Sequence, residues 1–115
     1  MNAFLLSAGF GTRLRPLTNQ IPKCLVKIKG EEILNIWIKK LKKIKINKIL
    51  INTHYLSYKV NNFLKKKKYK NVFSCYEESL LGTAGSLLNN YDFFKDEDVM
   101  LIHTDNYIED NLIDF

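Results

Sequence analysis

The sequence SAGFGTRLRPLT, residues 7–18, directly follows a short apolar run, AFLL, at residues 3–6. The apolar run is typical of a buried strand, so the glycines fall where a strand ends and its backbone amides become free. Gly9 and Gly11 permit a tight loop and let backbone N–H groups approach an anion closely. Three nearby side chains add hydrogen-bond donors suited to a polyphosphate: Thr12, Arg13 and Lys23. This stretch therefore predicts a phosphate-binding loop after the first strand.

The spacing of the glycines separates the families of loop that compete for this stretch. A Walker loop, GxxxxGK[ST], and a dinucleotide-binding fingerprint, GxGxxG, both require a glycine at position 14, where the chain has Leu14. The dinucleotide fingerprint also expects an acidic residue at the end of the second strand, whereas the second apolar run ends in Asn52-Thr53-His54. The Walker interpretation fails, and the dinucleotide interpretation is weak.

Apolar runs alternate with helical patterns along the chain, which predicts βα units and a parallel sheet. Four strands are expected, at residues 3–6, 48–53, 71–76 and 98–103. Helices are expected at residues 31–46, at 57–68 with Ser57 as the N-cap, behind the loop that starts at residue 77, and at 109–115. The predicted fold class is α/β, a Rossmann-like, doubly wound and mainly parallel sheet with ligands at the carboxyl ends of its strands.

The composition favours one cytoplasmic domain. The chain has 115 residues, of which 46% are hydrophobic, and no apolar run approaches the ~18–20 residues of a membrane span. No signal-peptide pattern follows Met1. Cys24 and Cys75 lack the spacing of a metal site or a redox motif, so buried or half-buried thiols are expected.

The net charge of +6 is divided unevenly along the chain. Residues 1–70 carry 15 Lys and two Arg against Glu31 and Glu32, whereas residues 71–115 carry Lys95 against ten acidic residues. The four lysines at 65–68 could suggest nucleic-acid binding, but no aromatic platform, zinc motif or helix-turn-helix pattern accompanies them. We therefore expect a solvated helix end there, and no nucleic-acid or membrane partner.

The sequence AGFGTRLRPLT at residues 8–18, followed by PKCL at 22–25, resembles the signature of the nucleotidyltransferases that join a nucleoside triphosphate to a sugar 1-phosphate. Taken alone, LGTAGSL at residues 81–87 is an ordinary glycine-containing loop before a helix. Beside the first motif, it resembles the second motif of the same family, which lies against base and ribose. The resemblance implies a nucleotidyltransferase fold truncated after about four strands, with residues 1–115 as its N-terminal, nucleotide-binding part.

The resemblance assigns the phosphate end of the nucleotide to the first motif. It implies that Gly9, Gly11 and Thr12 hold the triphosphate through backbone and hydroxyl donors. It also implies that Arg13 pairs with the departing β and γ phosphates, and that Lys23 neutralises charge where the two substrates' phosphates meet. Arg13 and Lys23 are thus the expected catalytic residues.

The resemblance assigns the base and ribose to residues further along the chain. It implies that Leu6 and Ala8 lie beside them and that Gly82 offers backbone contacts to the base. Guanine presents adjacent N1–H and N2–H donors that one carboxylate accepts in parallel, and either Glu77 or Glu78 falls near the expected base edge. GTP is therefore the preferred substrate, with UTP, CTP and dTTP as the alternatives.

Asp105 follows the fourth expected strand. A carboxylate in this place can hold a Mg²⁺ ion that bridges phosphate oxygens, although aspartate is also a common turn residue. The resemblance places a metal-binding aspartate at this position and so favours Asp105 as the Mg²⁺ ligand.

The implied activity is transfer of a nucleoside monophosphate from the triphosphate to a sugar 1-phosphate, with release of pyrophosphate. The family's full-length members are longer, and their second half supplies the sugar pocket and further charged ligands. The chain is therefore expected to hold the nucleotide half of the site, with the other half elsewhere or a second chain covering an exposed sheet edge. The alternative is an inactive nucleotide-binding remnant or a regulatory module.

Overall fold

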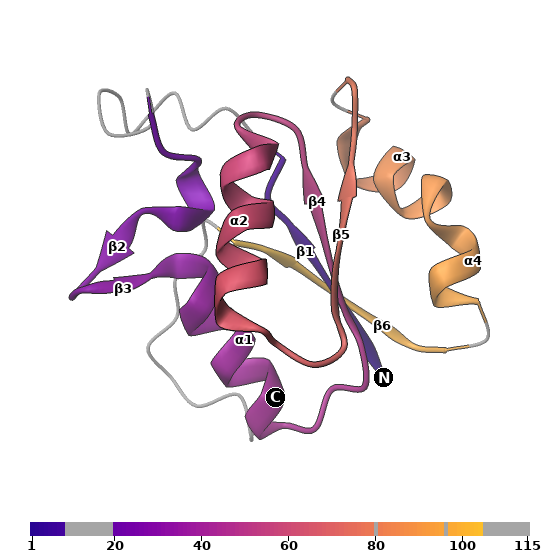
Figure 1. The fold of residues 1–115 in the computed structure, drawn as a ribbon. Helices are drawn as coiled ribbons and strands as arrows, with labels where there is room; N and C mark the ends of the chain where they lie inside the picture. Colours follow the sequence, from indigo (N-terminus) through magenta and orange to yellow (C-terminus); the bar gives the residue numbers. More distant parts are fainter. Residues whose placement is uncertain (9–19, 80, 96, 105–115) are drawn as a thin grey trace.

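The chain folds around one parallel sheet. The computed structural model describes residues 1–8, 20–79, 81–95 and 97–104 (Figure 1). The sheet contains four strands in the order β5-β4-β1-β6, all of them parallel to their neighbours. Their bounds are β1 (Asn2–Leu6), β4 (Ile49–Thr53), β5 (Val72–Tyr76) and β6 (Val99–His103). The predicted α/β class with a parallel sheet is confirmed.

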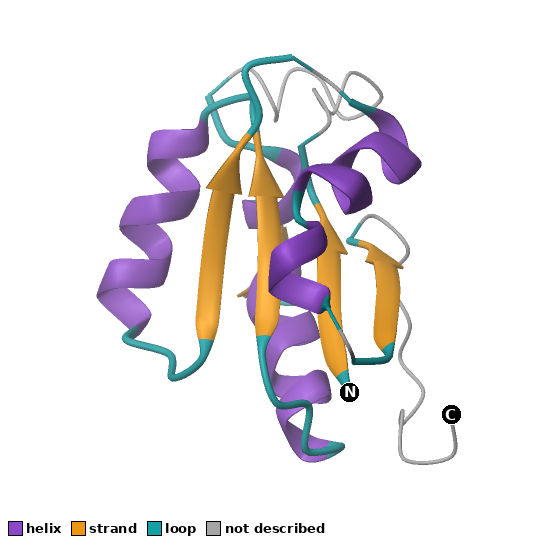
Figure 2. Cartoon of the chain, turned by 90° about the vertical axis from the view of Figure 1, so that its right-hand side faces the viewer, coloured by secondary structure: helices purple, strands orange, loops and turns teal. Residues whose placement is uncertain are grey.

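Helices cover both faces of this sheet (Figure 2). One face carries α1 (Ile33–Lys43) and α2 (Ser57–Lys67), and the other carries α3 (Gly82–Asn89) and α4 (Tyr91–Phe94). The chain goes from β1 through β4 to β5 on one side and then returns to place β6 on the other side of β1. This reversal is the topological switch point at which open α/β sheets bind ligands. No helix in the described segments is long and apolar enough to cross a membrane.

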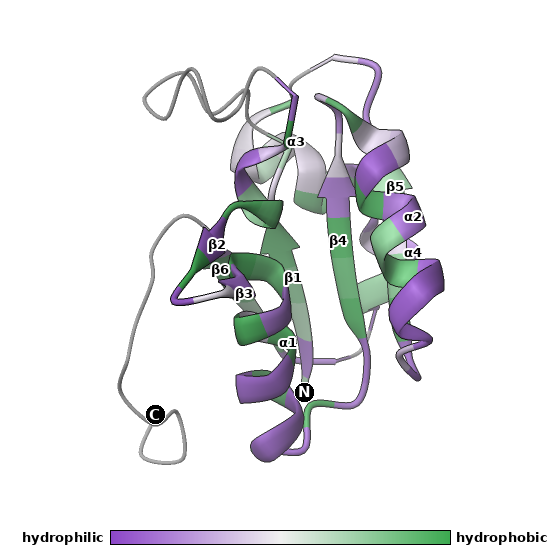
Figure 3. Cartoon of the chain, turned by 60° about the vertical axis from the view of Figure 1, so that its left-hand side comes forward, coloured by the Kyte–Doolittle hydropathy of each residue, from purple (hydrophilic) through white to green (hydrophobic). Residues whose placement is uncertain are grey.

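The two helical layers create two apolar clusters, one on each face. The larger cluster joins alternate residues of the strands to the inner face of α1, with Leu5, Leu34 and Leu41 fully buried. The smaller cluster packs Phe4 and Leu50 against Phe94, and the rings of Phe4 and Phe94 lie 5.3 Å apart. Figure 3 shows the apolar central strands and the hydrophilic outer surface of the helices. Because β1 and β4 are apolar on both faces, their side chains can take part in chemistry only at their ends.

A short hairpin replaces the expected first turn of α1. Strands β2 (Lys27–Ile28) and β3 (Glu31–Glu32) pair antiparallel around Lys29 and Gly30, whose φ angles are 53° and 82°. Two central residues with positive φ define a tight turn that favours glycine at its second position. The helix therefore begins at Ile33, and the prediction that it starts at residue 31 is wrong.

The predicted N-cap of α2 is also wrong. Ser57 is the first residue of the helix, and the capping position belongs to Leu56, which has a φ of 53° and makes no side-chain capping hydrogen bond.

The C-terminal end of α1 is capped without a glycine. The N–H groups of Lys45 and Ile46 donate to the carbonyl groups of Lys42 and Leu41, respectively. This is the pairing of a Schellman motif, with Lys45 in the left-handed conformation.

The apolar layer under α1 should dominate the stability of the fold. Leu41 is fully buried and Leu88 is 74% exposed, so the same substitution at the two positions separates burial from chemistry. We expect Leu41→Ala to lower the free energy of unfolding by ~2–5 kcal/mol and Leu88→Ala by less than about 0.5 kcal/mol. Urea unfolding followed by the fluorescence of Trp37, the one tryptophan of the chain, measures both, and equal losses would contradict this packing.

Candidate functional site

A pocket of about 220 Å³ lies at the edge of the sheet where the four parallel strands end. Pockets that enclose a drug-sized ligand have ~300–1,000 Å³, so the described walls fit part of a nucleotide and not all of it. The ends of all four strands and the first turns of α3 contribute to its lining: Leu6, Ala8, Asn52, Glu77, Leu81, Gly82, Thr83, Ser86 and His103.

The structure brings together the residues predicted for the base and ribose. Leu6 and Ala8 come from the end of β1, Glu77 directly follows β5, and Gly82 opens α3; all four line the pocket. Glu78, the alternative to Glu77, is exposed and is not part of the lining. Of the two glutamates, Glu77 is therefore the one whose side chain could meet a ligand in this pocket.

Glu77 is held by its backbone on both sides. Its N–H donates to the carbonyl oxygen of Thr53 at 2.7 Å, and its own carbonyl oxygen lies 2.6 Å from Nδ1 of His54. A carbonyl oxygen only accepts, so Nδ1 of His54 carries the hydrogen in this contact. The His54 ring also stacks on Tyr76 with 6.2 Å between the ring centroids. These contacts give His54 a structural role and leave Glu77 only 3% exposed.

The LGTAGSL motif forms the wall of the pocket opposite the strands. Gly82 has a φ of 73°, a conformation that residues with a Cβ rarely adopt, and it is the first residue of α3. Gly85 has a different reason to be glycine, since a Cβ atom there would lie 3.0 Å from Cβ of Leu81. The two glycines of the motif thus serve the backbone turn into α3 and the close packing of its first turn.

Lys23 does not line this pocket but begins the short 3-10 helix η3 (Lys23–Leu25). The apolar residues around it are anchored: Pro22 and Cys24 are buried, and η3 packs against α1. The backbone of Lys23 is fixed as well, because its carbonyl accepts the N–H of Val26 at 3.1 Å. The backbone of Lys23 is therefore anchored by its buried neighbours and by this hydrogen bond.

The switch point between β1 and β6 is closed by Thr104. Leu6 lies opposite His103 in the parallel ladder, and both the N–H and the hydroxyl of Thr104 lie 3.3 Å from the carbonyl oxygen of Leu6. The indole N–H of Trp37 donates to the Thr104 carbonyl at 3.1 Å. The described residues next to the glycine loop and next to Asp105 are thus neighbours at one edge.

Five predicted site residues lie outside the described residues: Gly9, Gly11, Thr12, Arg13 and Asp105. Their roles, and the Mg²⁺ ion assigned to Asp105, stay predictions. Within the described part of the chain, no group of three histidine, cysteine or acidic residues could hold a metal ion. Mg²⁺ commonly uses one or two carboxylates together with substrate phosphates, so a single aspartate is a donor of the right chemistry.

Asn52 is a pocket residue that the sequence analysis did not select. It is 4% exposed and stands near the end of β4, where it contacts both Ser7 and Glu77. The sequence does carry a signal, because an asparagine directly follows the apolar run ILI at residues 49–51. Buried polar side chains of this kind need partners, but the sequence alone does not say which partners they find.

Cys24 gives a pH-dependent test of the anchor beside Lys23. Burial raises the pKa of the Cys24 thiol to about 12, although a hydrogen bond with Ser7 acts in the opposite direction. The stability gained from keeping this thiol neutral is complete below about pH 9, the ordinary value, and is lost as the pH rises toward 12. We expect wild-type unfolding free energy to fall faster than that of Cys24→Ala between pH 8.5 and 10.5, by up to ~1.4 kcal/mol per unit. Parallel curves from urea unfolding would contradict this burial.

Comparison with known proteins agrees with the fold and the motifs. The family model named nucleotidyl transferase matches residues 2–115. The chain is 42% identical over 73 residues to CTP:phosphoglutamine cytidylyltransferase of Campylobacter jejuni, covering 64% of this chain and 29% of that protein. It is 38% identical over 90 residues to mannose-1-phosphate guanylyltransferase 1 of Arabidopsis thaliana, covering 76% and 25%.

A solved structure shows the same fold. The structure of CTP:phosphocholine cytidylyltransferase from Streptococcus pneumoniae superposes with a TM-score of 0.79 and 29% identity, covering 96% of this chain and 47% of that chain. The chain thus spans less than a third of the two curated relatives and about half of the solved one. Because the family model spans residues 2–115, the chain belongs to the nucleotidyl transferase family.

Proposed function

We propose that this chain supplies the nucleotide-binding part of an enzyme that transfers a nucleoside monophosphate from GTP to a sugar 1-phosphate. One observation supports the proposal most strongly. The chain belongs to the nucleotidyl transferase family, and its Glu77, Gly82, Leu6 and Ala8 line one pocket at the edge of the sheet where the strand order reverses. The four residues come from two segments, at positions 6–8 and 77–82, that are far apart in the sequence. They converge where α/β sheets bind nucleotides.

The base end of the pocket favours guanine. The Glu77 carboxylate is buried in the lining and can accept two parallel N–H donors, which guanine presents on its N1 and N2 atoms. Cytosine offers one exocyclic amine to the same carboxylate. Relatives are named both as guanylyltransferases and as cytidylyltransferases, so CTP is the competing substrate. The count of donors on the base edge is the reason to prefer GTP.

The phosphate end is assigned to the glycine loop after Ala8 and to Lys23. In the proposed reaction, an oxygen of the sugar phosphate forms a bond to the α-phosphorus, and the bond from that phosphorus to the bridging oxygen breaks, releasing pyrophosphate. Positioning and charge neutralisation supply most of the rate in such transfers. Gly9, Gly11 and Thr12 would position the triphosphate. The side chains that would neutralise its charge are Arg13 and Lys23. Mg²⁺, held by Asp105, would neutralise further phosphate charge.

Pyrophosphate release tests the catalytic assignment. In an enzyme that also contains the sugar-binding half of the site, supplied with GTP, Mg²⁺ and mannose 1-phosphate, we expect Lys23→Ala and Asp105→Ala each to lower turnover by about two orders of magnitude, because losing a charged transition-state contact costs ~3–4 kcal/mol. Lys27→Ala and Asp92→Ala, at exposed positions, are the matched controls. Near-normal rates in the first pair would refute the roles. A completed enzyme that binds GTP but releases no pyrophosphate would favour the alternative, a nucleotide-binding module without transfer.

Competition binding among GTP, CTP, UTP and dTTP tests the base. We expect GTP to bind most tightly, and Glu77→Gln to weaken it by about tenfold or more, since a hydrogen bond to a charged group contributes ~1.5–3 kcal/mol. Glu78→Gln makes the same chemical change at the exposed neighbour and should leave GTP binding unchanged. Tighter binding of CTP than of GTP would reject the guanine assignment.

A further inference from the structure

Asn52 is the most connected buried polar side chain of the pocket. The side-chain oxygen of Asn52 accepts a hydrogen bond from the backbone N–H of Ser7 at 2.6 Å, and the backbone carbonyl oxygen of Asn52 accepts one from the Ser7 hydroxyl at 2.7 Å. Its amide nitrogen lies 3.4 Å from both carboxylate oxygens of Glu77 and 3.4 Å from the hydroxyl of Ser86. One side chain on β4 thus contacts the residue after β1, the residue after β5 and the helix α3.

The orientation of this amide follows from its partners. The backbone N–H of Ser7 can only donate, so the amide oxygen of Asn52 must face it. The NH₂ group then points to the Glu77 carboxylate, which accepts. The contact with Ser7 is short and those with Glu77 and Ser86 are long, so the amide is anchored at β1 and reaches from there into the pocket.

We propose that Asn52 is a positioning residue that holds the base-binding carboxylate of Glu77 in register with the segment leading into the glycine loop. Ser7 is two residues before Gly9, so the amide oxygen fixes the start of the phosphate-binding segment. The NH₂ group fixes the Glu77 side chain at the base edge. This inference rests on the proposed nucleotide site. It adds one residue that connects the base end of that site with its phosphate end.

Asn52→Asp separates the contact with Ser7 from the contact with Glu77. An aspartate keeps an acceptor for the Ser7 N–H but loses the NH₂ donor and places a second carboxylate beside Glu77. The phosphate end should be preserved and the base end disturbed. Asn52→Leu has a similar size and neither hydrogen-bonding group, so it should disturb both ends.

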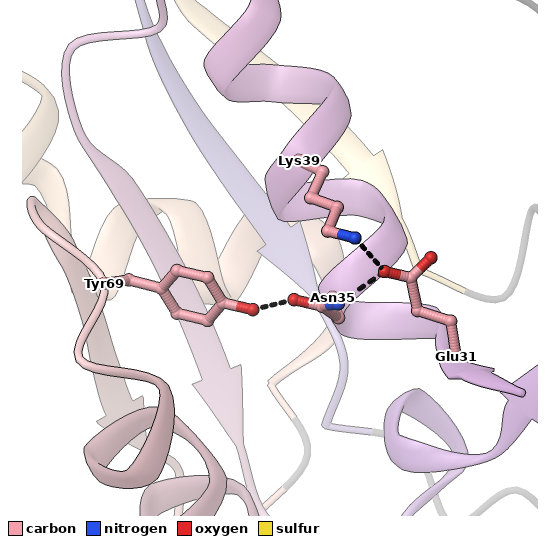
Figure 4. A network of polar contacts seen from close by, with 4 residues as sticks. All are labelled: Glu31, Asn35, Lys39 and Tyr69. Atoms are coloured by element: carbon pink, nitrogen blue, oxygen red, sulfur yellow. Dashed lines mark hydrogen bonds and ion pairs between the residues drawn. The ribbon is translucent and has the colours of Figure 1, made fainter.

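Asn35 provides a matched control away from the pocket. It is also a buried asparagine, 5% exposed, and its NH₂ group donates to the Glu31 carboxylate at 2.5 Å while its amide oxygen accepts the Tyr69 hydroxyl (Figure 4). Glu31 also pairs with Lys39 at 2.6 Å. Asn35→Asp therefore makes the same change beside a glutamate, at a place that does not line the pocket.

The experiment compares GTP with inorganic tripolyphosphate, each titrated in the presence of Mg²⁺ into the full chain. We expect Asn52→Asp to weaken GTP by about tenfold or more and to leave tripolyphosphate unchanged. Asn35→Asp should change neither ligand, although both variants lose stability. Loss of GTP affinity in Asn52→Asp no larger than in Asn35→Asp, or an equal loss for both ligands, would overturn the positioning role.

Hydrogen exchange of the Ser7 amide measures the anchor without a nucleotide. Protection of the Ser7 amide should be the same in Asn52→Asp as in the wild-type chain and should fall in Asn52→Leu. Equal protection of this amide in the wild-type chain and both variants would overturn the inference even if GTP binds. A failure of the proposed function looks different: the wild-type chain would then bind neither GTP nor tripolyphosphate. Should Asn52→Leu not fold, the comparison of Asn52→Asp with Asn35→Asp decides the question.

Discussion

The burial of two central strands on both faces is the constraint on which the rest of the structure depends. Strands β1 and β4 lie between two helical layers, and Phe4, Leu5 and Ile51 are fully buried in them. Side chains in their middle can only pack, so polar groups appear where the strands end. Asn52 and Thr53 stand at such an end and are almost fully buried. The same burial that stabilises the fold therefore concentrates its chemistry at one edge.

That edge collects groups from the whole chain because the strand order reverses beside β1. The order β5-β4-β1-β6 brings the first and last described strands together, with Leu6 opposite His103 and Thr104 bonded to the Leu6 carbonyl. Glu77 directly follows β5, the outer strand on the opposite side of the sheet from β6, and its backbone is held by contacts with Thr53 and His54. The pocket is thus a product of topology first, and its side chains then set which ligand it takes.

Much of the fold could be predicted from the sequence, because apolar runs and helical periodicity report burial directly. The four strands followed from four apolar runs, at residues 3–6, 48–53, 71–76 and 98–103, and the family resemblance followed from the glycine motifs. The hairpin at Lys29-Gly30 cannot be predicted in the same way, because its two strands have only two residues each and show no recognisable alternation. The sequence also favours Ser57 as the N-cap of α2, whereas Leu56 holds that position. The contacts of Asn52 could not be predicted, because they join residues that only the sheet register brings together.

A titration of the isotope-labelled chain with GTP and Mg²⁺, followed by the chemical shifts of its backbone amides, tests the nucleotide assignment most directly. The largest changes are expected at residues lining the pocket at the strand ends: Leu6, Ala8, Asn52, Glu77, Leu81, Gly82, Thr83, Ser86 and His103. Another hollow, of about 380 Å³, lies between α2 and β5 and is lined by Asn61, Leu64, Lys65, Val72 and Ser74. Changes confined to that hollow, or no changes at saturating GTP, would contradict a nucleotide site at the switch edge of the sheet.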